Sequence, residues 1–135
     1  MLNEELISQL RSKLRQVLPD LELLYLFGSV AAGEEHGGSD LDLAVLHASP
    51  TSKWEFWMLS QKLSLEMHRQ IDLVDLHEAS TVLKMEVVSK GQLLFEKNPD
   101  QRAEFEMLAF SDYARLNEER RGILQDVRQR GSIYG

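Results

Sequence analysis

A glycine-serine turn and a pair of aspartates stand close together in the first third of the chain. Gly28 and Ser29 follow an apolar run at residues 23–27, and Asp40 and Asp42 open the next apolar run after ten intervening residues. A strand that ends at Gly-Ser and enters a short helical turn exposes N–H groups that favour phosphate. Strand side chains alternate, so we expect the two carboxylates on one face, roughly 6–7 Å apart.

These carboxylates predict a metal site, because like charges on one strand face repel unless a cation neutralises them. Mg²⁺ is a hard cation that takes carboxylates together with substrate phosphates. A third acid is available in the short apolar strand predicted at 71–76, where Asp72 and Asp75 fall on opposite faces. We favour Asp72, which lies near the start of its strand, and expect Asp75 to end the strand or cap the next turn. Three acids suit two-metal phosphoryl transfer.

The combination of Gly28-Ser29, Asp40, Asp42 and Asp72 resembles the nucleotidyltransferase superfamily related to DNA polymerase beta, in its small MntA-like form. That form comprises the antitoxins of HEPN/MNT toxin–antitoxin pairs. The resemblance runs from residue 21 through 72–76 to 91–96, and the tail at 125–135 is also similar. The chain departs from the family turn G-S-x-A-R-G at Ala32, which replaces an arginine. Binding of a triphosphate must then depend more on metal, backbone N–H groups or another cation.

What the resemblance implies is a metal-dependent protein adenylyltransferase. ATP would bind with its phosphates at Gly28 and Ser29, and Asp40, Asp42 and Asp72 would be both the catalytic residues and the ligands of two Mg²⁺ ions. The acceptor would be a tyrosine hydroxyl of the cognate HEPN toxin, an RNase that AMP transfer neutralises. Such toxins carry an R-x4-H-x-Y motif that is absent from this sequence, so the chain would be the modifier.

Two alternatives remain beside this function. The chain could be a non-catalytic antitoxin that blocks the toxin by direct binding, with a nucleotide site weakened at Ala32. It could also be a small-molecule nucleotidyltransferase with an aminoglycoside-like acceptor. Larger enzymes of that kind use an extra helical domain to hold the acceptor, and 135 residues leave no length for one. This shortage favours an acceptor that arrives as a folded macromolecule.

Composition predicts one globular domain spanning residues 1–135, with 43% hydrophobic and 27% charged residues. The net charge of −7 argues against sequence-independent nucleic-acid binding, which needs clustered Lys and Arg. The absence of cysteine excludes disulfides and thiolate metal sites. No apolar run reaches the roughly 18 residues of a membrane span, so we expect a cytoplasmic protein without a membrane segment.

Hydrophobic periodicity and capping residues predict the elements that position these groups. Helices are predicted at 3–18, 53–68, 80–90 and 99 to about 130, strands at 22–27, 41–47, 71–76 and 92–97, a helical turn at 29–33 and a loop at 34–39. Thr51 or Ser52 and Ser80 are the expected N-caps, and Gly91 is the expected stop. This order predicts an α/β (α+β) fold with a small mixed sheet, covered by helices mainly on one side, and suits the nucleotidyltransferase core.

The last predicted helix, about 99–130, carries a second prediction. Its apolar residues advance by threes and fours along the whole length, and we expect the first half to pack on the sheet. A helix of about 30 residues spans roughly 45 Å, which exceeds the sheet of so small a domain. We therefore expect residues 116–134 to form a protein interface.

Several aromatic and histidine residues are expected to be structural. Trp54 and Trp57 lie one helical turn apart, and we interpret them as core residues in preference to a base-stacking platform. His36 is expected in a solvated loop. We interpret His47, His68 and His77 as surface or edge residues, because their spacing does not match a metal site.

Overall fold

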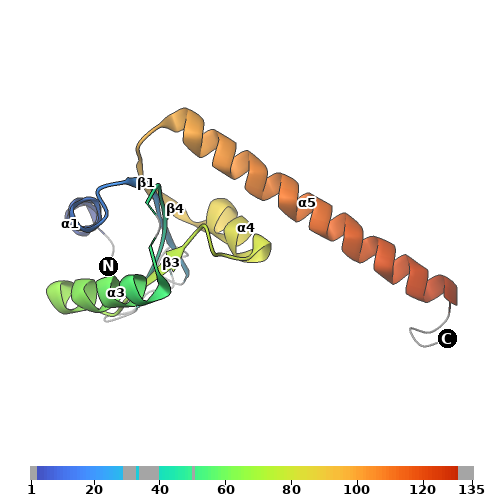
Figure 1. The fold of residues 1–135 in the computed structure, drawn as a ribbon, viewed down its shortest axis with the longest axis horizontal. Helices are drawn as coiled ribbons and strands as arrows, with labels where there is room; N and C mark the ends of the chain where they lie inside the picture. The colour runs from blue at the N-terminus through green and yellow to red at the C-terminus, as the bar shows by residue number, and fades with distance from the viewer. Residues whose placement is uncertain (1–2, 29–32, 34–39, 50, 131–135) are drawn as a thin grey trace.

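A four-stranded mixed sheet forms the centre of the protein, as the computed structural model shows (Figure 1). The structure describes residues 3–28, 33, 40–49 and 51–130. The strands are β1 (Leu21–Phe27), β2 (Leu41–His47), β3 (Ile71–Asp75) and β4 (Gln92–Glu96), and they lie in the order β3-β2-β1-β4. β1 is antiparallel to β2 and β4, whereas β2 and β3 are parallel. The predicted mixed sheet is confirmed.

Four described helices connect and cover these strands: α1 (Glu4–Val17), α3 (Lys53–Met67), α4 (Thr81–Lys90) and α5 (Pro99–Arg130). Ser52 and Ser80 are the N-caps of α3 and α4, each accepting a backbone N–H three residues ahead at 3.1 Å. Gly91 ends α4 as predicted, but its φ of −75° is not left-handed. Glycine is required there because a Cβ would collide with the Val87 carbonyl oxygen.

Helices cover both faces of the sheet, so the prediction that they lie mainly on one side is wrong. α1 and α3 pack on one face, where Leu24, Leu43 and Val45 contribute to the larger core cluster. α4 and the first part of α5 cover the other face, over a smaller cluster that includes Leu23, Ala44 and Val87. Figure 1 shows the two pairs of helices on opposite sides of the strands. Strand alternation explains this arrangement, because both faces of β1 and β2 are apolar.

The first half of α5 is anchored to the sheet by a polar cluster. The Tyr25 hydroxyl donates a 2.9 Å hydrogen bond to Glu106 Oε1. Burial, and then this bond to a carboxylate, raises the pKa of Tyr25 far above its usual range, so the hydroxyl stays a donor. Arg102 pairs with Glu96 of β4 and lies 3.7 Å from Glu106. The first half of α5 therefore packs on the sheet, as the sequence predicts.

The second half of α5 extends away from the rest of the domain (Figure 1). Ile123 and Leu124 keep 63% and 56% of their surface in solvent there, while Leu116 and Val127 are half-buried. The helix has 32 residues and so is about 48 Å long. Among the described residues, no helix is both long enough and apolar enough to span a membrane.

Candidate active site

Gly28 and Asp42 meet where β1 ends. Phe27, the last residue of β1, is paired with Asp42 in the antiparallel register, and the chain then turns at Gly28 with a φ of +78°. A Cβ on residue 28 would overlap Asp42 Oδ2 and lie 3.2 Å from Asp42 Cγ. The left-handed backbone favours glycine here, and any side chain at residue 28 would have to displace the Asp42 carboxylate.

Asp42 and Asp72 are cross-strand neighbours on the same face of the sheet. They are direct partners in the parallel register of β2 and β3, and Asp40 precedes β2 by one residue. Asp42 is partly buried, whereas Asp40 and Asp72 are exposed. Burial raises the pKa of Asp42 above its ordinary 3.8, and the negative charges of Asp72 and Asp40 raise it further. The three carboxylates thus share one electrostatic environment.

Such a donor set suits a hard cation, because it consists of carboxylate oxygens that repel one another without a positive charge. The acids do not form a closed cage: in the part of the chain that the structure describes, no three His, Cys, Asp or Glu side chains are placed to hold one ion together. Asp72 Oδ1 accepts a 3.1 Å hydrogen bond from Gln70 Nε2. The arrangement fits an open site, in which substrate phosphates supply further ligands.

The predicted phosphate turn lies only partly within the described residues. Gly28 is described, but Ser29, Ala32 and the predicted loop at 34–39, with His36, lie outside them. Gly33 is described and has a φ of +77°, and no atom of the described residues lies within 4 Å of the place that a Cβ on this residue would occupy. Gly28 and Gly33, on either side of residues 29–32, thus both have left-handed backbones.

Asp75 behaves as the turn residue that the sequence predicts. Its Oδ1 accepts a 2.9 Å hydrogen bond from the His77 backbone N–H, and the alternation of β3 places it on the face opposite Asp72. Asp75 Oδ1 also lies 3.9 Å from Nε2 of His47. His47 is only 2% exposed, so its interpretation as a surface or edge residue is wrong. It shares the face of Leu43 and Val45 and packs 5.3 Å from the Phe56 ring centre.

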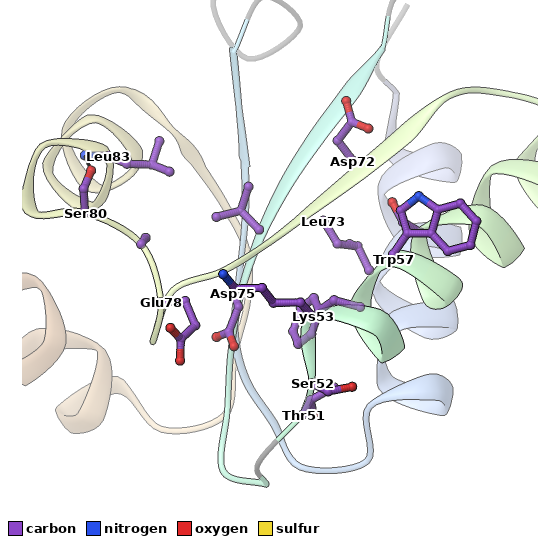
Figure 2. Close-up of a pocket in the computed structure, with 14 residues that line it drawn as sticks. Thr51, Ser52, Lys53, Trp57, Asp72, Leu73, Asp75, Glu78, Ser80 and Leu83 are labelled. Carbon is purple, nitrogen blue, oxygen red and sulfur yellow. Dashed lines mark hydrogen bonds between the residues drawn. The ribbon is translucent and has the colours of Figure 1, made fainter.

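A cleft of about 640 Å³ runs along β3 between α3 and the start of α4 (Figure 2). Its lining includes Asp72 near one end of the strand, Lys53 and Trp57 from α3, and Ser80 and Leu83 beside or on α4. β3 is an edge strand, since no strand among the described residues pairs with its outer side. The cleft is therefore contiguous with the carboxylates, a feature that the sequence did not reveal.

The two tryptophans of α3 are not core residues, contrary to the prediction. The buried stripe of α3 consists of Phe56, Ser60 and Leu63, which leaves the face of Trp54 and Trp57 toward solvent. Trp54 is 65% and Trp57 54% exposed, and their rings stack with centres 5.1 Å apart. Trp57 lines the cleft.

Sequence and structure comparisons relate this geometry to known proteins. Residues 8–100 match the family described as polymerase beta, nucleotidyltransferase. The protein adenylyltransferase MntA of Shewanella oneidensis is 42% identical over 126 residues, which are 93% of this chain and 88% of that relative.

Solved structures with similar chains include toxin–antitoxin complexes. A crystal structure of a toxin–antitoxin with AMP-PNP matches with a TM-score of 0.81 and 38% identity, over 90% of this chain and 98% of the other. The tri-AMPylated Shewanella oneidensis HEPN toxin in complex with MNT antitoxin contains a chain that matches with a TM-score of 0.75 and 36% identity. That match covers 90% of this chain and 95% of the other.

Proposed function

The chain belongs to the polymerase beta nucleotidyltransferase family, and we propose that it is a protein adenylyltransferase that acts as an antitoxin. It transfers AMP from ATP to a tyrosine hydroxyl of its cognate HEPN toxin and thereby neutralises the toxin. This function rests mainly on one observation: Asp42 and Asp72 are neighbours on adjacent strands, and the Asp42 carboxylate lies against Gly28. The similarity to MntA, and to a complex of MNT antitoxin with AMPylated HEPN toxin, supports the same reaction.

In this proposal the donor ATP lies with its phosphates at the turn that begins at Gly28 and continues to Ser29. Asp40 and Asp42 would hold Mg²⁺ at the triphosphate, and together with Asp72 they would hold a second Mg²⁺ near the acceptor, with phosphate oxygens supplying further ligands. Bound Mg²⁺ neutralises phosphate charge and lowers the pKa of the attacking hydroxyl. The mutual repulsion that raises the pKa of Asp42 supports this assignment, because a cation would relieve it.

The reaction is an in-line displacement at the α-phosphorus. The tyrosine hydroxyl releases its proton to solvent water and its oxygen bonds to that phosphorus. The bond to the oxygen bridging the α- and β-phosphorus atoms breaks, and pyrophosphate leaves. Catalysis of this kind depends mainly on positioning and charge stabilisation, which a small sheet domain can supply. The reaction consumes ATP, and we place it in the cytoplasm.

We further propose that α5 holds the partner. Residues 116–130 extend from the domain with Ile123 and Leu124 exposed, and the predicted interface continues to residue 134, beyond the described residues. Exposed apolar side chains on a projecting helix are typical of a helix that docks on another chain. The domain at residues 1–135 thus combines a catalytic sheet with an interaction helix.

The direct test uses the cognate toxin, ATP and Mg²⁺. We expect mass spectrometry to find one or more AMP groups on the toxin, attached to tyrosine. Replacement of Asp40 and Asp42 by Asn should abolish the adduct and leave the complex with the toxin intact. Tight binding without an adduct under any divalent metal would instead establish the non-catalytic antitoxin, and persistent transfer by the double variant would refute the site.

A further inference from the structure

We propose that the cleft along β3 binds the acceptor segment of the partner, and that this segment is a stretch of polypeptide with basic and aromatic side chains. The proposal rests on the proposed function, because it assigns the acceptor half of that reaction. It adds a binding site, with Trp57 as its aromatic anchor, to the carboxylates that perform the chemistry.

The order of the strands gives the direction of approach. Gly28 lies at the end of β1, Asp42 on the neighbouring β2, and Asp72 on β3, so the site extends across the sheet toward its edge. Displacement at phosphorus is in line, so the attacking oxygen approaches from the side opposite the leaving pyrophosphate. With the phosphates at Gly28, that side is the one on which Asp72 lies. The cleft begins at Asp72 and runs along β3 toward Asp75 and Glu78, between α3 and the start of α4.

The lining of the cleft fits a peptide better than a nucleotide. Asp72, Asp75 and Glu78 line it, and Lys53 is the one basic side chain among the described lining residues. Even without Asp72, which is assigned to Mg²⁺, Asp75 and Glu78 outnumber Lys53, so the cleft disfavours a free triphosphate and attracts a segment with Arg, Lys or protonated His. Leu73 and Leu83 add apolar surface, against which an aromatic side chain can pack. The volume of about 640 Å³ accommodates more than one residue of a docked segment.

The edge of β3 offers backbone groups to the same segment. Ile71 presents its N–H and C=O outward, and Ser64 and Ser60 of α3 bind them, at 2.9 Å for Ile71 N to Ser64 Oγ. By alternation, the backbone groups of Leu73 also point outward, at a place where no described strand pairs with β3. An extended segment can hydrogen-bond there, while specificity comes from the cleft.

Trp57 is the residue at which binding to the cleft can be tested. Its indole is 54% exposed at the cleft, and exposed tryptophan is enriched at the energetic centres of interfaces. Trp54 provides a matched comparison, because it stacks on Trp57 and is 65% exposed but does not line the cleft. Leu65 is a second comparison on the same helix, 78% exposed and outside the cleft.

The first experiment places a photo-crosslinking amino acid at position 57 or 65 in a chain that also carries Asp42→Asn. Irradiation of its complex with the cognate toxin, followed by peptide mapping, identifies the neighbouring segment without any need for catalysis. We expect position 57 to crosslink to the segment that contains the AMP-accepting tyrosine and position 65 not to do so. A crosslink from position 57 to another part of the toxin, or none, would overturn the proposal.

The second experiment compares Trp57→Ala with Trp54→Ala in AMP transfer. We expect Trp57→Ala to lower kcat/KM for the toxin about tenfold or more, and Trp54→Ala to change it far less. Affinity for Mg²⁺-ATP should stay unchanged in both variants. Loss of ATP affinity in Trp57→Ala would instead make the cleft a nucleotide site. If the unmodified chain transferred no AMP while position 57 still crosslinked to a tyrosine-bearing basic segment, the adenylyltransferase function would fail and the docking cleft would stand.

Discussion

The carboxylate of Asp42 occupies the space that a side chain at Gly28 would need. This relationship joins the two halves of the site, because Gly28 begins the turn proposed for phosphate and Asp42 is a proposed metal ligand. The pairing of Phe27 with Asp42 in the β1–β2 ladder fixes the contact, so the sheet would set the distance between the proposed phosphate and metal positions. A substitution at either residue should therefore shift the position of the other.

The first prediction concerns Gly28→Ala. The new methyl group would displace the Asp42 carboxylate, and the left-handed backbone would add strain of roughly 1–2 kcal/mol. We expect a large loss of AMP transfer, of the order of 10²-fold, since small displacements of catalytic groups are costly.

Gly33→Ala is the matched control for this change. Gly33 has nearly the same φ, +77° against +78°, but none of the described residues lies within 4 Å of the place that an added Cβ would take. It should lose comparable stability in urea unfolding and much less activity than Gly28→Ala. Equal losses of activity in both variants would show that backbone strain, and not the displaced carboxylate, limits the reaction.

A second prediction follows from the raised pKa of Asp42. The folded chain holds this proton more tightly than the unfolded chain, so stability is lost as pH rises from the ordinary 3.8 through the folded pKa. Above that window the charged carboxylate remains a cost to the metal-free protein. Asp42→Asn should therefore raise the free energy of unfolding in EDTA at neutral pH, by less than about 1 kcal/mol because solvent screens the group.

Mg²⁺ should make the unmodified chain more stable than Asp42→Asn, the reverse of the order expected in EDTA. It should raise the Tm of the unmodified chain, because binding to the folded state stabilises it, and should have a smaller effect on Asp42→Asn. Differential scanning calorimetry at pH 7, once with EDTA and once with Mg²⁺, measures the Tm of both proteins. A metal-induced shift of equal size in both proteins would exclude Asp42 as a ligand.

The third prediction separates Asp72 from Asp75, which lie three residues apart on one strand and face opposite ways. Asp72→Asn should reduce AMP transfer by orders of magnitude with little change in stability, because Asp72 is exposed and faces Asp42. Asp75→Asn should retain the 2.9 Å turn bond to the His77 N–H through its amide oxygen and should lose far less activity than Asp72→Asn, because it removes only one negative charge from the cleft. Steady-state kinetics with the toxin measures both, and the reverse order of effects would refute the choice of Asp72.

The fourth prediction concerns the anchor of α5. Tyr25→Phe removes the 2.9 Å bond to Glu106, and we expect a loss of about 1–2 kcal/mol in the free energy of unfolding. Glu106→Gln keeps an oxygen that can accept the bond and should cost less. Urea unfolding with an unchanged m-value would assign the loss to the folded state. A neutral result for Tyr25→Phe would show that Arg102 alone holds Glu106.

Much of this fold could be predicted from local signals. Apolar periodicity located every strand and long helix, and the caps Ser52 and Ser80 follow directly from residue type. The pairing of Asp42 with Asp72 needed one further fact, the parallel register of β2 and β3, which strand periodicity alone does not determine.

The errors share a physical cause, which is that burial depends on long-range packing. Trp54 and Trp57 are large and apolar, but the stripe of α3 that meets the sheet runs through Phe56 and Leu63. His47 is polar and yet buried, because it continues the inward alternation of Leu43 and Val45. That alternation was visible in the sequence and could have placed His47 in the core. The cleft arises where the stretches 51–60 and 72–83 pack around the edge of β3, so no local pattern predicts it.

The last prediction tests the projecting half of α5 as the partner-binding element. Ile123→Asp places a charge on the exposed apolar surface and should weaken toxin binding about tenfold or more without unfolding the domain, because the side chain is 63% exposed. Met107→Asp is the control, since Met107 is 62% exposed on the same helix but lies in the half that packs on the sheet. Truncation after Arg115 should abolish binding, as titration calorimetry with the toxin would measure. If the truncated chain bound with unchanged affinity, the partner would have to dock on the sheet domain, and the cleft beside Trp57 would carry the whole interaction.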